Sequence, residues 1–425
     1  MQDCRRFSPT KTRHRDNQRA GLAGTNYNER PTKLALTFGI IAVGLAGRSA
    51  LDKILALRGG AELVALWAQL SAIIEMVAAI ASSGVGAGLS VLVAQTALRE
   101  RQLLFLRRAL VLGLAVAAPV ACVAALGGWQ FAESIGGPQL ARGAMVIAAA
   151  AGWIAVIHGV VNSYWLGQQR RDLMLALAVA AAAAALAAGA FAPRGFVLEA
   201  ITLSQALPSL VALLVWRRSD AQPRAEDRAL ERYLLPGVVI GVLSPLSMLV
   251  ARSVVADSLS WHESGVLQAL WRISDWIAGF AAGVLSVLYL PRLAAAYPVP
   301  GMAALLRRSV IAVLAPCALL FAALFAVYQP LLEALYDQSF HAPPLAAALL
   351  FAGSLARIAA WIPLFGLYAA RRTGAIAVGE LLSLPLFAAL VLALGDRLTL
   401  EAAGAAWLAS YLAYGAFNFW ALRKA

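Results

Sequence analysis

Apolar runs long enough to cross a lipid bilayer follow one another almost without pause from Lys33 to Leu422. A hydrocarbon core of roughly 30 Å needs about 20 apolar residues per helix, and only helices or closed barrels satisfy the backbone there. Hydrophobic residues make up 61% of the chain and charged residues 13%. The sequence therefore predicts an all-α polytopic membrane protein rather than a soluble globular domain.

About twelve spans satisfy this length criterion. Their predicted bounds are Leu34–Leu57, Leu63–Thr96, Leu103–Gly127, Ala141–Leu166, Leu173–Phe191, Gly195–Trp216, Leu230–Asp257, Ser264–Leu293, Leu305–Tyr328, Pro344–Ala370, Ala375–Leu394 and Leu398–Leu422. Residues 1–33 are polar and basic and lack the apolar core and cleavage site of a signal peptide. We expect them to form a disordered cytoplasmic tail ahead of a retained first span.

Basic residues alternate sides in this twelve-span arrangement. Most of the 35 Lys and Arg residues lie in the tail and in the loops that follow even-numbered spans, whereas the opposite loops carry mainly acidic residues. This is the positive-inside pattern, so we expect both termini in the cytoplasm. Because the net charge of +13 follows membrane topology, we predict no nucleic-acid partner.

The longest polar interruption after the tail divides the predicted spans into two equal groups. It is centred on residues 217–229, which we interpret as a cytoplasmic linker. The N-terminal half is then 34–216 and the C-terminal half 230–425. Two six-helix halves with the same orientation would form a parallel repeat around a central cavity.

Motifs for enzymatic chemistry are missing from the sequence. The three cysteines form no CxxC pair, the four histidines show no HExxH spacing, and no GxxxxGK[ST] phosphate loop occurs. The predicted outside loops are short, which disfavours a membrane glycosyltransferase or polymerase. We therefore predict no catalytic residues, no metal site and no cofactor.

Nine ionisable residues fall inside predicted spans. Each would cost about 2.5 kcal/mol or more if it faced lipid at the bilayer centre, so these residues should face protein or a water-filled cavity. They are Arg48, Asp52, Lys53, Glu75, Arg252, Arg272, Asp275, Arg357 and Glu380. They are the candidate site residues, apart from Glu380, which lies near a span end and is better explained as interfacial.

Two pairs among these residues share a helix face. Arg48 and Asp52 are four residues apart, and Arg272 and Asp275 are three apart. Each pair is either a structural ion pair or part of a cavity, and the sequence leaves both readings open. Glu75 is either an arginine partner or a titrating group.

The arginines of the spans favour an anionic ligand. Arg252 and Arg357 have no carboxylate nearby in sequence, which favours a cavity role for both. Guanidinium groups hold phosphate through paired hydrogen bonds and keep their charge at any physiological pH. A cavity lined by Arg48, Arg252, Arg272 and Arg357 would suit a phosphate or pyrophosphate group.

The segment from Glu263 to Leu293 resembles the eighth-span signature of Wzx-type O-antigen and enterobacterial common antigen flippases. The matching residues are Gly265, Gln268, Ala269, Trp271, Arg272, Ile273, Ser274, Asp275, Tyr289, Leu290, Pro291, Arg292 and Leu293. The segment Lys53 to Gly88 resembles the first-to-second span passage of that family more loosely. One departure is Val85-Gly86-Ala87, where relatives often carry Asn.

This resemblance implies a member of the multidrug/oligosaccharidyl-lipid/polysaccharide (MOP) exporter superfamily, with a MATE-like fold. It implies a flippase that moves undecaprenyl-pyrophosphate-linked oligosaccharide across the bacterial inner membrane by alternating access, for O-antigen or a related surface polysaccharide. The four arginines would bind the pyrophosphate, and Asp52, Glu75 and Asp275 would serve ion coupling or gating. The expected partners are the lipid-linked substrate, the bilayer and other polysaccharide-assembly proteins.

Two further points stay open at the level of sequence. Coupling to a proton or sodium gradient is compatible with the resemblance, but no motif selects between the two ions. The alternative function is a cation-coupled multidrug exporter of the same superfamily. That function would predict a cavity dominated by carboxylates and aromatic rings.

Overall fold

A computed structural model describes residues 31–80, 85–136, 142–209, 230, 234–289, 293, 301–370 and 372–424. In these residues the chain is helical and forms no strand, which confirms the predicted all-α class. Nearly all of the predicted tail, the predicted linker 217–229 and part of the glycine-rich segment 82–88 lie outside the described residues. The division into two halves therefore stays a prediction.

The helices up to residue 204 belong to the predicted N-terminal half. They are α2 (Pro31–Ala79), α3 (Gly86–Gln95), α4 (Arg99–Gln130), α5 (Ala132–Gly136), α6 (Arg142–Gly167), α7 (Arg171–Phe191), the short 3-10 helix η2 (Arg194–Phe196) and α8 (Val197–Ser204). Those of the predicted C-terminal half are α10 (Leu234–Ser258), α11 (Trp261–Val284), η4 (Leu285–Tyr289), α13 (Gly301–Leu335), α14 (Pro344–Ala369), α15 (Thr373–Leu381), α16 (Leu384–Leu394), η5 (Gly395–Arg397) and α17 (Leu400–Arg423).

Glycine and proline break the helices at two informative places. Within α2 the chain turns at Gly59 and Gly60, and Gly60 has φ +65, a conformation that glycine adopts without a steric penalty. This turn separates the first two predicted spans. The predicted span Ala375–Leu394 is divided into α15 and α16, because Pro385 in the first turn of α16 lacks the backbone N–H that a continuous helix would need.

Seven helices among the described residues are long and apolar enough to cross a membrane. The number is lower than the predicted twelve partly because α2 holds two predicted spans on either side of its glycine turn. The described part of the sixth predicted span is short, since α8 ends at Ser204. In α11 the charges of Glu263, Arg272 and Asp275 lower the hydropathy.

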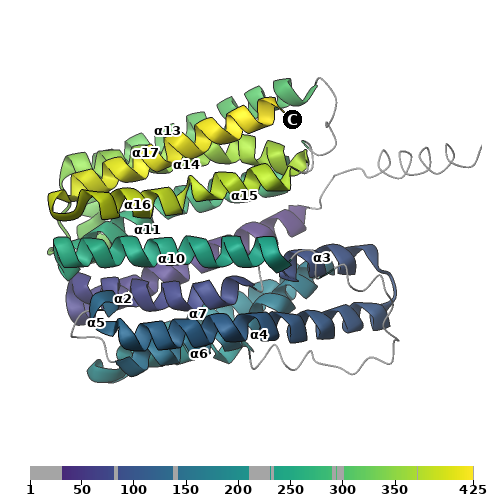
Figure 1. The fold of residues 1–425 in the computed structure, drawn as a ribbon, viewed down its shortest axis with the longest axis horizontal. Coiled ribbons are helices and arrows are strands. Elements are labelled where there is room, and N and C mark those ends of the chain that lie inside the picture. The colour runs from purple at the N-terminus through teal and green to yellow at the C-terminus, as the bar shows by residue number, and fades with distance from the viewer. Residues whose placement is uncertain are drawn as a thin grey trace, which may run out of the picture.

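Helices α10 and α11 lie between two groups of helices (Figure 1). Both pack against α2, while α10 also contacts α16 and α11 also contacts α14. The beginning of α2 and the end of α17 lie at the same end of the molecule (Figure 1). An even number of crossings produces this arrangement, as the charge pattern predicts.

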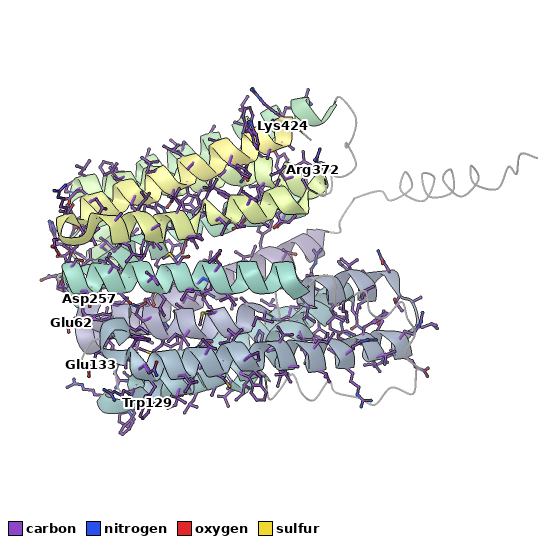
Figure 2. All side chains as sticks on the ribbon, in the orientation of Figure 1. Glu62, Trp129, Glu133, Asp257, Arg372 and Lys424 are labelled. Atoms are coloured by element: carbon purple, nitrogen blue, oxygen red, sulfur yellow. The ribbon has the colours of Figure 1, made fainter. Side chains whose placement is uncertain are left out.

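Charged side chains separate between the two ends. Arg372 and Lys424 lie at the end where α2 begins, and Glu62, Glu133 and Asp257 lie at the opposite end (Figure 2). The basic end is the one that the positive-inside rule predicts to be cytoplasmic. We call it the inner end and the opposite one the outer end.

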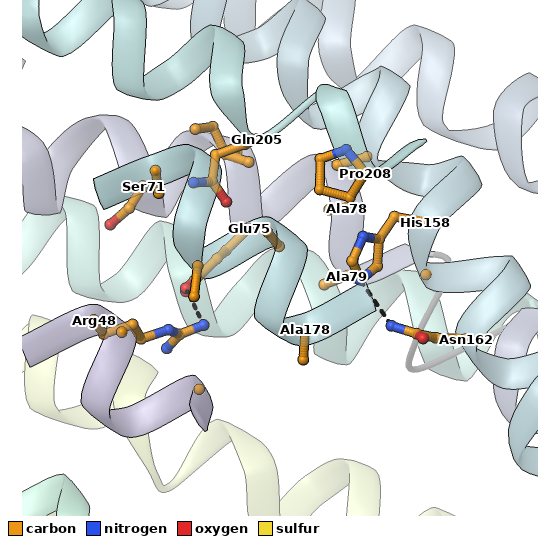
Figure 3. A pocket seen from close by; sticks show the side chains of 18 of the residues that line it. Arg48, Ser71, Glu75, Ala78, Ala79, His158, Asn162, Ala178, Gln205 and Pro208 are labelled. Carbon is orange, nitrogen blue, oxygen red and sulfur yellow. Dashed lines mark hydrogen bonds and ion pairs between the residues drawn. The ribbon is translucent and has the colours of Figure 1, made fainter. Parts of the chain in front are cut away.

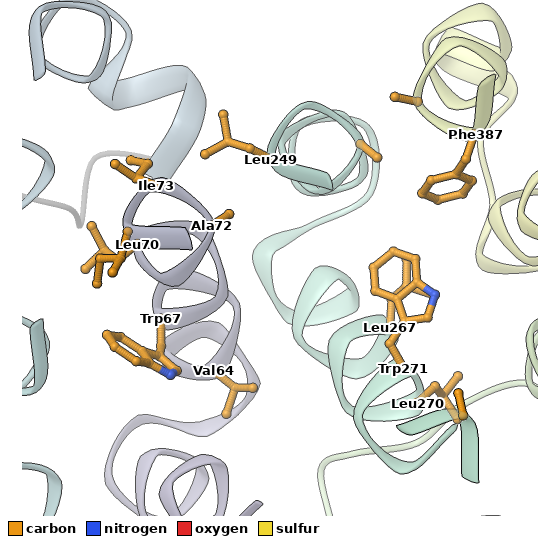
Figure 4. Packing of buried hydrophobic residues seen from close by; sticks show 14 of the residues in the cluster. Val64, Trp67, Leu70, Ala72, Ile73, Leu249, Leu267, Leu270, Trp271 and Phe387 are labelled. Atoms are coloured by element: carbon orange, nitrogen blue, oxygen red, sulfur yellow. The ribbon is translucent and has the colours of Figure 1, made fainter. Parts of the chain in front are cut away.

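The hydrophobic core continues across the boundary between the predicted halves. In Figure 4, Ala72 and Ile73 of α2 lie toward Leu249 of α10, and Trp271 of α11 points toward Phe387 of α16. The rings of Trp271 and Phe387 meet edge to face at 5.7 Å. This contact fixes α11 against the C-terminal group, so its opposite face is left to meet α2.

Candidate functional site

A buried ion pair joins α2 to α11. The Nε of Arg272 donates to Oδ2 of Asp52 at 2.6 Å, and the two side chains are 11% and 1% exposed. Both groups are largely removed from lipid and water, so each depends on the other for charge compensation. The partner of Arg272 is therefore on the other predicted half, and not Asp275 on its own helix.

A second pair links α11 to α14. The NH2 group of Arg357 donates to Oδ1 of Asp275 at 2.5 Å. The Arg357 guanidinium also lies over the rings of Trp361, Trp407 and Tyr411 at 5.3, 5.5 and 5.9 Å from their centroids. The aromatic rings and the carboxylate together hold this cation inside the C-terminal group of helices.

The third pair is open rather than buried. Arg48 and Glu75, both on α2 but on opposite sides of its glycine turn, approach to 3.3 Å, with side chains 61% and 52% exposed. The distance is longer than in the two buried pairs and the exposure is far greater. This cation and this anion are accessible to a ligand.

The exposed pair lines a cavity of about 930 Å³. The lining comes from α2, α6, α7, residues 205 and 208 after α8, α10 and Arg272 of α11. Figure 3 shows the Arg48–Glu75 and His158–Asn162 pairs at separate places on its wall. Ser71, Glu75 and Ala79 line it in the second part of α2, and Gly241 and Pro245 near the start of α10, so the cavity lies toward the inner end.

The predicted site residues divide by location. Among the described residues that line the cavity are Arg48, Glu75 and Arg272, but neither Arg252 nor Arg357. Arg252 donates to the carbonyl of Ala68 at 3.0 Å, in the contact between α10 and α2. The structure thus brings together two of the four candidate arginines and holds the other two in helix contacts.

Glu380 is a partly buried residue of α15 that contacts α17. Its Oε1 accepts from the hydroxyl of Tyr414 at 2.8 Å. The Ser383 hydroxyl donates to the Glu380 backbone carbonyl at 2.6 Å, beside the break between α15 and α16. Glu380 thus helps to hold the broken span against α17.

Contacts between the predicted halves gather at the outer end. The Lys53 ammonium donates to the carbonyls of Ala334 and Tyr336 at 3.0 and 2.6 Å, at the C-terminal end of α13. Gly265 of α11 is so close to Ala61 of α2 that a Cβ at Gly265 would overlap the Ala61 carbonyl. The molecule is therefore closed at the outer end, while the cavity lies toward the inner end.

Three cavity residues were missed by the sequence analysis. His158 and Asn162 of α6 are 2.7 Å apart between Nε2 and Nδ2, and Gln205 follows α8. A signal was present, because His158 and Asn162 are polar residues four apart in an otherwise apolar run. A search restricted to charges passes over them.

Sequence comparison and structure comparison give different results. No protein-family model matches the sequence, and no curated protein matches it. Solved structures do match: one is described as the inward-facing conformation of a multidrug resistance MATE family transporter of the MOP superfamily. It has a TM-score of 0.70 and 14% identity, over 92% of this chain and 97% of that chain. The chain has the fold of the MATE/MOP transporters.

Two further solved structures share the MATE/MOP fold with this chain. An outward-facing conformation of a multidrug resistance MATE family transporter matches with a TM-score of 0.63 and 14% identity, over 92% of this chain and 95% of that one. A MOP superfamily transporter from Pyrococcus furiosus Vc1, described as having a binding pocket of reverse polarity, matches with a TM-score of 0.65 and 13% identity over the same shares. The predicted MATE-like fold of a multi-pass membrane protein is thereby confirmed.

Three of the candidate carboxylates pair with arginine. They are Asp52, Glu75 and Asp275. No group of three or more His, Cys, Asp or Glu side chains that could hold a metal ion occurs among the described residues. Pairs of a carboxylate with arginine can hold an anion, exchange partners or lock helices.

Proposed function

We propose that this protein moves an undecaprenyl-pyrophosphate-linked oligosaccharide across a bacterial inner membrane by alternating access. The observation that carries the proposal is the open Arg48–Glu75 pair in the cavity of about 930 Å³. Ionisable side chains that lie open to a cavity inside a membrane protein typically mark the path of a substrate or an ion. Pyrophosphate, with several anionic oxygens, matches the paired N–H groups of arginine.

The loose partner of Arg48 explains how a substrate could be gripped and released. Glu75 lies 3.3 Å from Arg48 and is half exposed, so a phosphate can replace it without opening a buried ion pair. Arg272 reaches the same cavity with its charge already balanced by Asp52. Exchange of Glu75 for pyrophosphate at Arg48 is the binding step that we propose.

An apolar wall faces these charges. Ala178, Ala181, Ala182 and Ala185 of α7 line the cavity and leave its volume free of large side chains. A bulky sugar needs such space, while a prenyl chain is equally soluble in the surrounding lipid. We propose that the sugar and the pyrophosphate occupy the cavity and that the prenyl tail stays in the bilayer.

Closure at the outer end and a cavity toward the inner end are the features of an inward-facing state. In that state a substrate assembled on the cytoplasmic leaflet would enter. Translocation would require the Lys53 and Gly265 contacts to separate and the inner ends of α2 and α10 to approach. Asp52, Glu75 and Asp275 are the proposed gating or coupling groups for a proton or sodium gradient.

A cation-coupled multidrug exporter is the second candidate. One specific observation favours it: Glu75 presents a half-exposed carboxylate in the same cavity, where it could hold a lipophilic cation or a proton. The MATE transporters with a similar fold are described as multidrug resistance proteins. The two candidates differ in which member of the Arg48–Glu75 pair binds the ligand.

A complementation assay separates these candidates. Cells without their own flippase would express the wild-type chain, Arg48→Ala, Arg48→Lys or Arg142→Ala at matched membrane levels, and surface glycan would be measured. We expect Arg48→Ala to lose most of the glycan and Arg48→Lys to give an intermediate amount, since lysine keeps the charge but not the paired geometry. Arg142 is the matched control, an exposed arginine at the outer end that pairs with Glu133 at 3.5 Å.

Two outcomes would contradict the proposal. Full glycan export by Arg48→Ala would show that Arg48 does not hold the substrate. If the wild-type chain restores no tested glycan but confers drug resistance that Glu75→Gln abolishes, the exporter function replaces the flippase function.

A further inference from the structure

One face of α6 is directed to the cavity over three turns. The lining residues on this helix are Ala155, His158, Gly159, Asn162, Ser163 and Leu166, which follow helical spacing. In contrast to the α2 wall, the polar side chains of this face, His158, Asn162 and Ser163, form no ion pair among the described residues. The cavity therefore has an ionic part on α2 and an uncharged polar part on α6 (Figure 3).

His158 and Asn162 are incompletely satisfied by the described chain. Nε2 of His158 lies 2.7 Å from Nδ2 of Asn162, so one imidazole nitrogen and one amide group contact each other. The Asn162 Oδ1 is buried and has no hydrogen-bond partner among the described residues. An asparagine amide offers two donors and an acceptor with two lone pairs, so Asn162 retains unused bonding capacity.

Unused polar groups inside a membrane protein need an explanation. A buried polar atom without a partner is destabilising, because it gives up its hydrogen bonds to water on folding and gains none in return. Gln205 adds a second amide to this cavity, and its side chain makes no hydrogen bond to the described residues. These convergent polar groups beside an alanine wall are typical of a ligand-orienting subsite.

We propose that His158, Asn162 and Gln205 form a second subsite of the cavity, which hydrogen-bonds hydroxyl or acetamido groups of the sugar that adjoins the pyrophosphate. This inference rests on the proposed function, because it assigns the sugar end of the same substrate. The separation between the two polar parts of the wall matches a ligand with an anionic linkage at one end and neutral hydroxyl groups at the other (Figure 3). A lipophilic cation would leave these amides without partners.

Hydrogen bonding makes this subsite selective. A site built to bond a sugar hydroxyl discriminates against a ligand that lacks it, because its own polar groups are then left unpaired. Each net hydrogen bond contributes about 0.5–1.5 kcal/mol, so two or three bonds provide a preference of about tenfold or more. The pyrophosphate would provide common affinity, and α6 would provide the preference among head groups.

The test compares two probes on one protein preparation. The full chain in lipid nanodiscs would be titrated with farnesyl pyrophosphate and with farnesyl pyrophosphate that carries one N-acetylglucosamine. We expect the wild type to bind the sugar-bearing probe about tenfold more tightly. His158→Phe and Asn162→Leu should each reduce this ratio, and the double variant should bring it to about one.

The ratio of affinities controls for folding, because both probes meet the same sample. His158→Gln and Asn162→Ser provide a second, milder pair of variants and should reduce the ratio partially. Val146→Ala, at an exposed position of the same helix, should leave the ratio unchanged. Arg48→Ala should weaken the binding of both probes equally, since both carry pyrophosphate.

The outcomes separate the two proposals. Equal binding of both probes by the wild type, with both weakened by Arg48→Ala, would overturn the sugar subsite and leave the pyrophosphate site intact. A sugar preference that His158 and Asn162 variants remove, with no effect of Arg48→Ala, would support the subsite and overturn the role of Arg48. Failure of both probes to bind would overturn both.

Discussion

Ion pairs in this protein join residues that lie far apart in the sequence. Asp52 and Arg272 are separated by 220 positions and lie 2.6 Å apart. The sequence correctly drew attention to these charges because each is costly in lipid. It could not assign their partners, since sequence spacing reveals only neighbours on the same helix. Asn162 carries no formal charge, so a criterion based on charged residues does not select it.

The buried pair of Asp52 and Arg272 should contribute to the stability of the protein. Asp52→Leu strands the Arg272 charge and should lower the free energy of unfolding by about 3–5 kcal/mol. The double variant with Arg272→Met leaves no charge and should recover most of this loss. Thermal unfolding in detergent would measure both effects.

An exposed ion pair provides the control for this experiment. Arg170 and Asp172 also form an ion pair, at 2.9 Å, but both side chains are exposed. Asp172→Leu should change the unfolding midpoint little, because water solvates the remaining charge. If Asp52→Leu were equally mild, or the double variant no better than the single one, charge compensation would not be the reason for the pair.

At the scale of helices, small residues determine where space is left. Alanine-rich α7 was predicted correctly as a span, with bounds that differ by two residues at its start. Its cavity face could not be identified from the sequence, because alanine occupies both sides of the helix. The turn at Gly59 and Gly60 follows directly from a Gly-Gly pair, whereas the division of the predicted span Ala375–Leu394 into α15 and α16 needed the structure.

Filling the cavity from α7 should block transport without unfolding the protein. Ala178 lines the cavity, and Ala183 on the same helix is exposed on the opposite side of the lining. Ala178→Phe should reduce surface glycan several-fold in the complementation assay, because the ring occupies space needed by the sugar. Ala183→Phe would face lipid and should retain export.

Expression and unfolding midpoint must match between these two variants for the comparison to hold. Normal export by Ala178→Phe would mean that substrate does not pass along this wall. Equal loss in both variants would indicate that bulk anywhere on α7 disturbs the fold.

The whole molecule is fastened at its outer end by contacts of two kinds. Arg58 donates to the carbonyls of Gly189, Ala190 and Ala192 at the end of α7, within the N-terminal group of helices. Lys53 donates to carbonyls at the C-terminal end of α13, in the C-terminal group. The overall fold was predictable from apolar runs and charge alternation. The conformational state, closed at the outer end, was not. That state depends on such contacts between distant carbonyls and single side chains.

Loss of the Lys53 contact should favour opening at the outer end. A cysteine at Ala269, fully buried on the α11 face toward α2, would report this opening after the native cysteines are replaced. With Lys53→Met, we expect a membrane-impermeant thiol reagent to label Ala269→Cys several-fold faster in intact cells. Methionine retains the length of the side chain and removes the donors.

Arg58→Met is the matched control for this measurement. It removes a similar capping cation from the same helix, but its contacts stay within one group of helices, so labelling of Ala269→Cys should not increase. Unchanged labelling with Lys53→Met would refute the fastening role, and equal increases in both variants would point to general loosening.

The long sequence separation between Asp52 and Arg272 has a consequence for how the protein is made. The first span must enter the bilayer while Arg272 is still untranslated, so Asp52 has no mature partner at that time. Arg48, one turn away, is then the cation on the same helix face that can compensate it. Arg48 and Asp52 would thus be temporary partners during biogenesis. Once α11 has inserted, Arg272 would replace Arg48 as the partner of Asp52, and Arg48 would become available to the cavity.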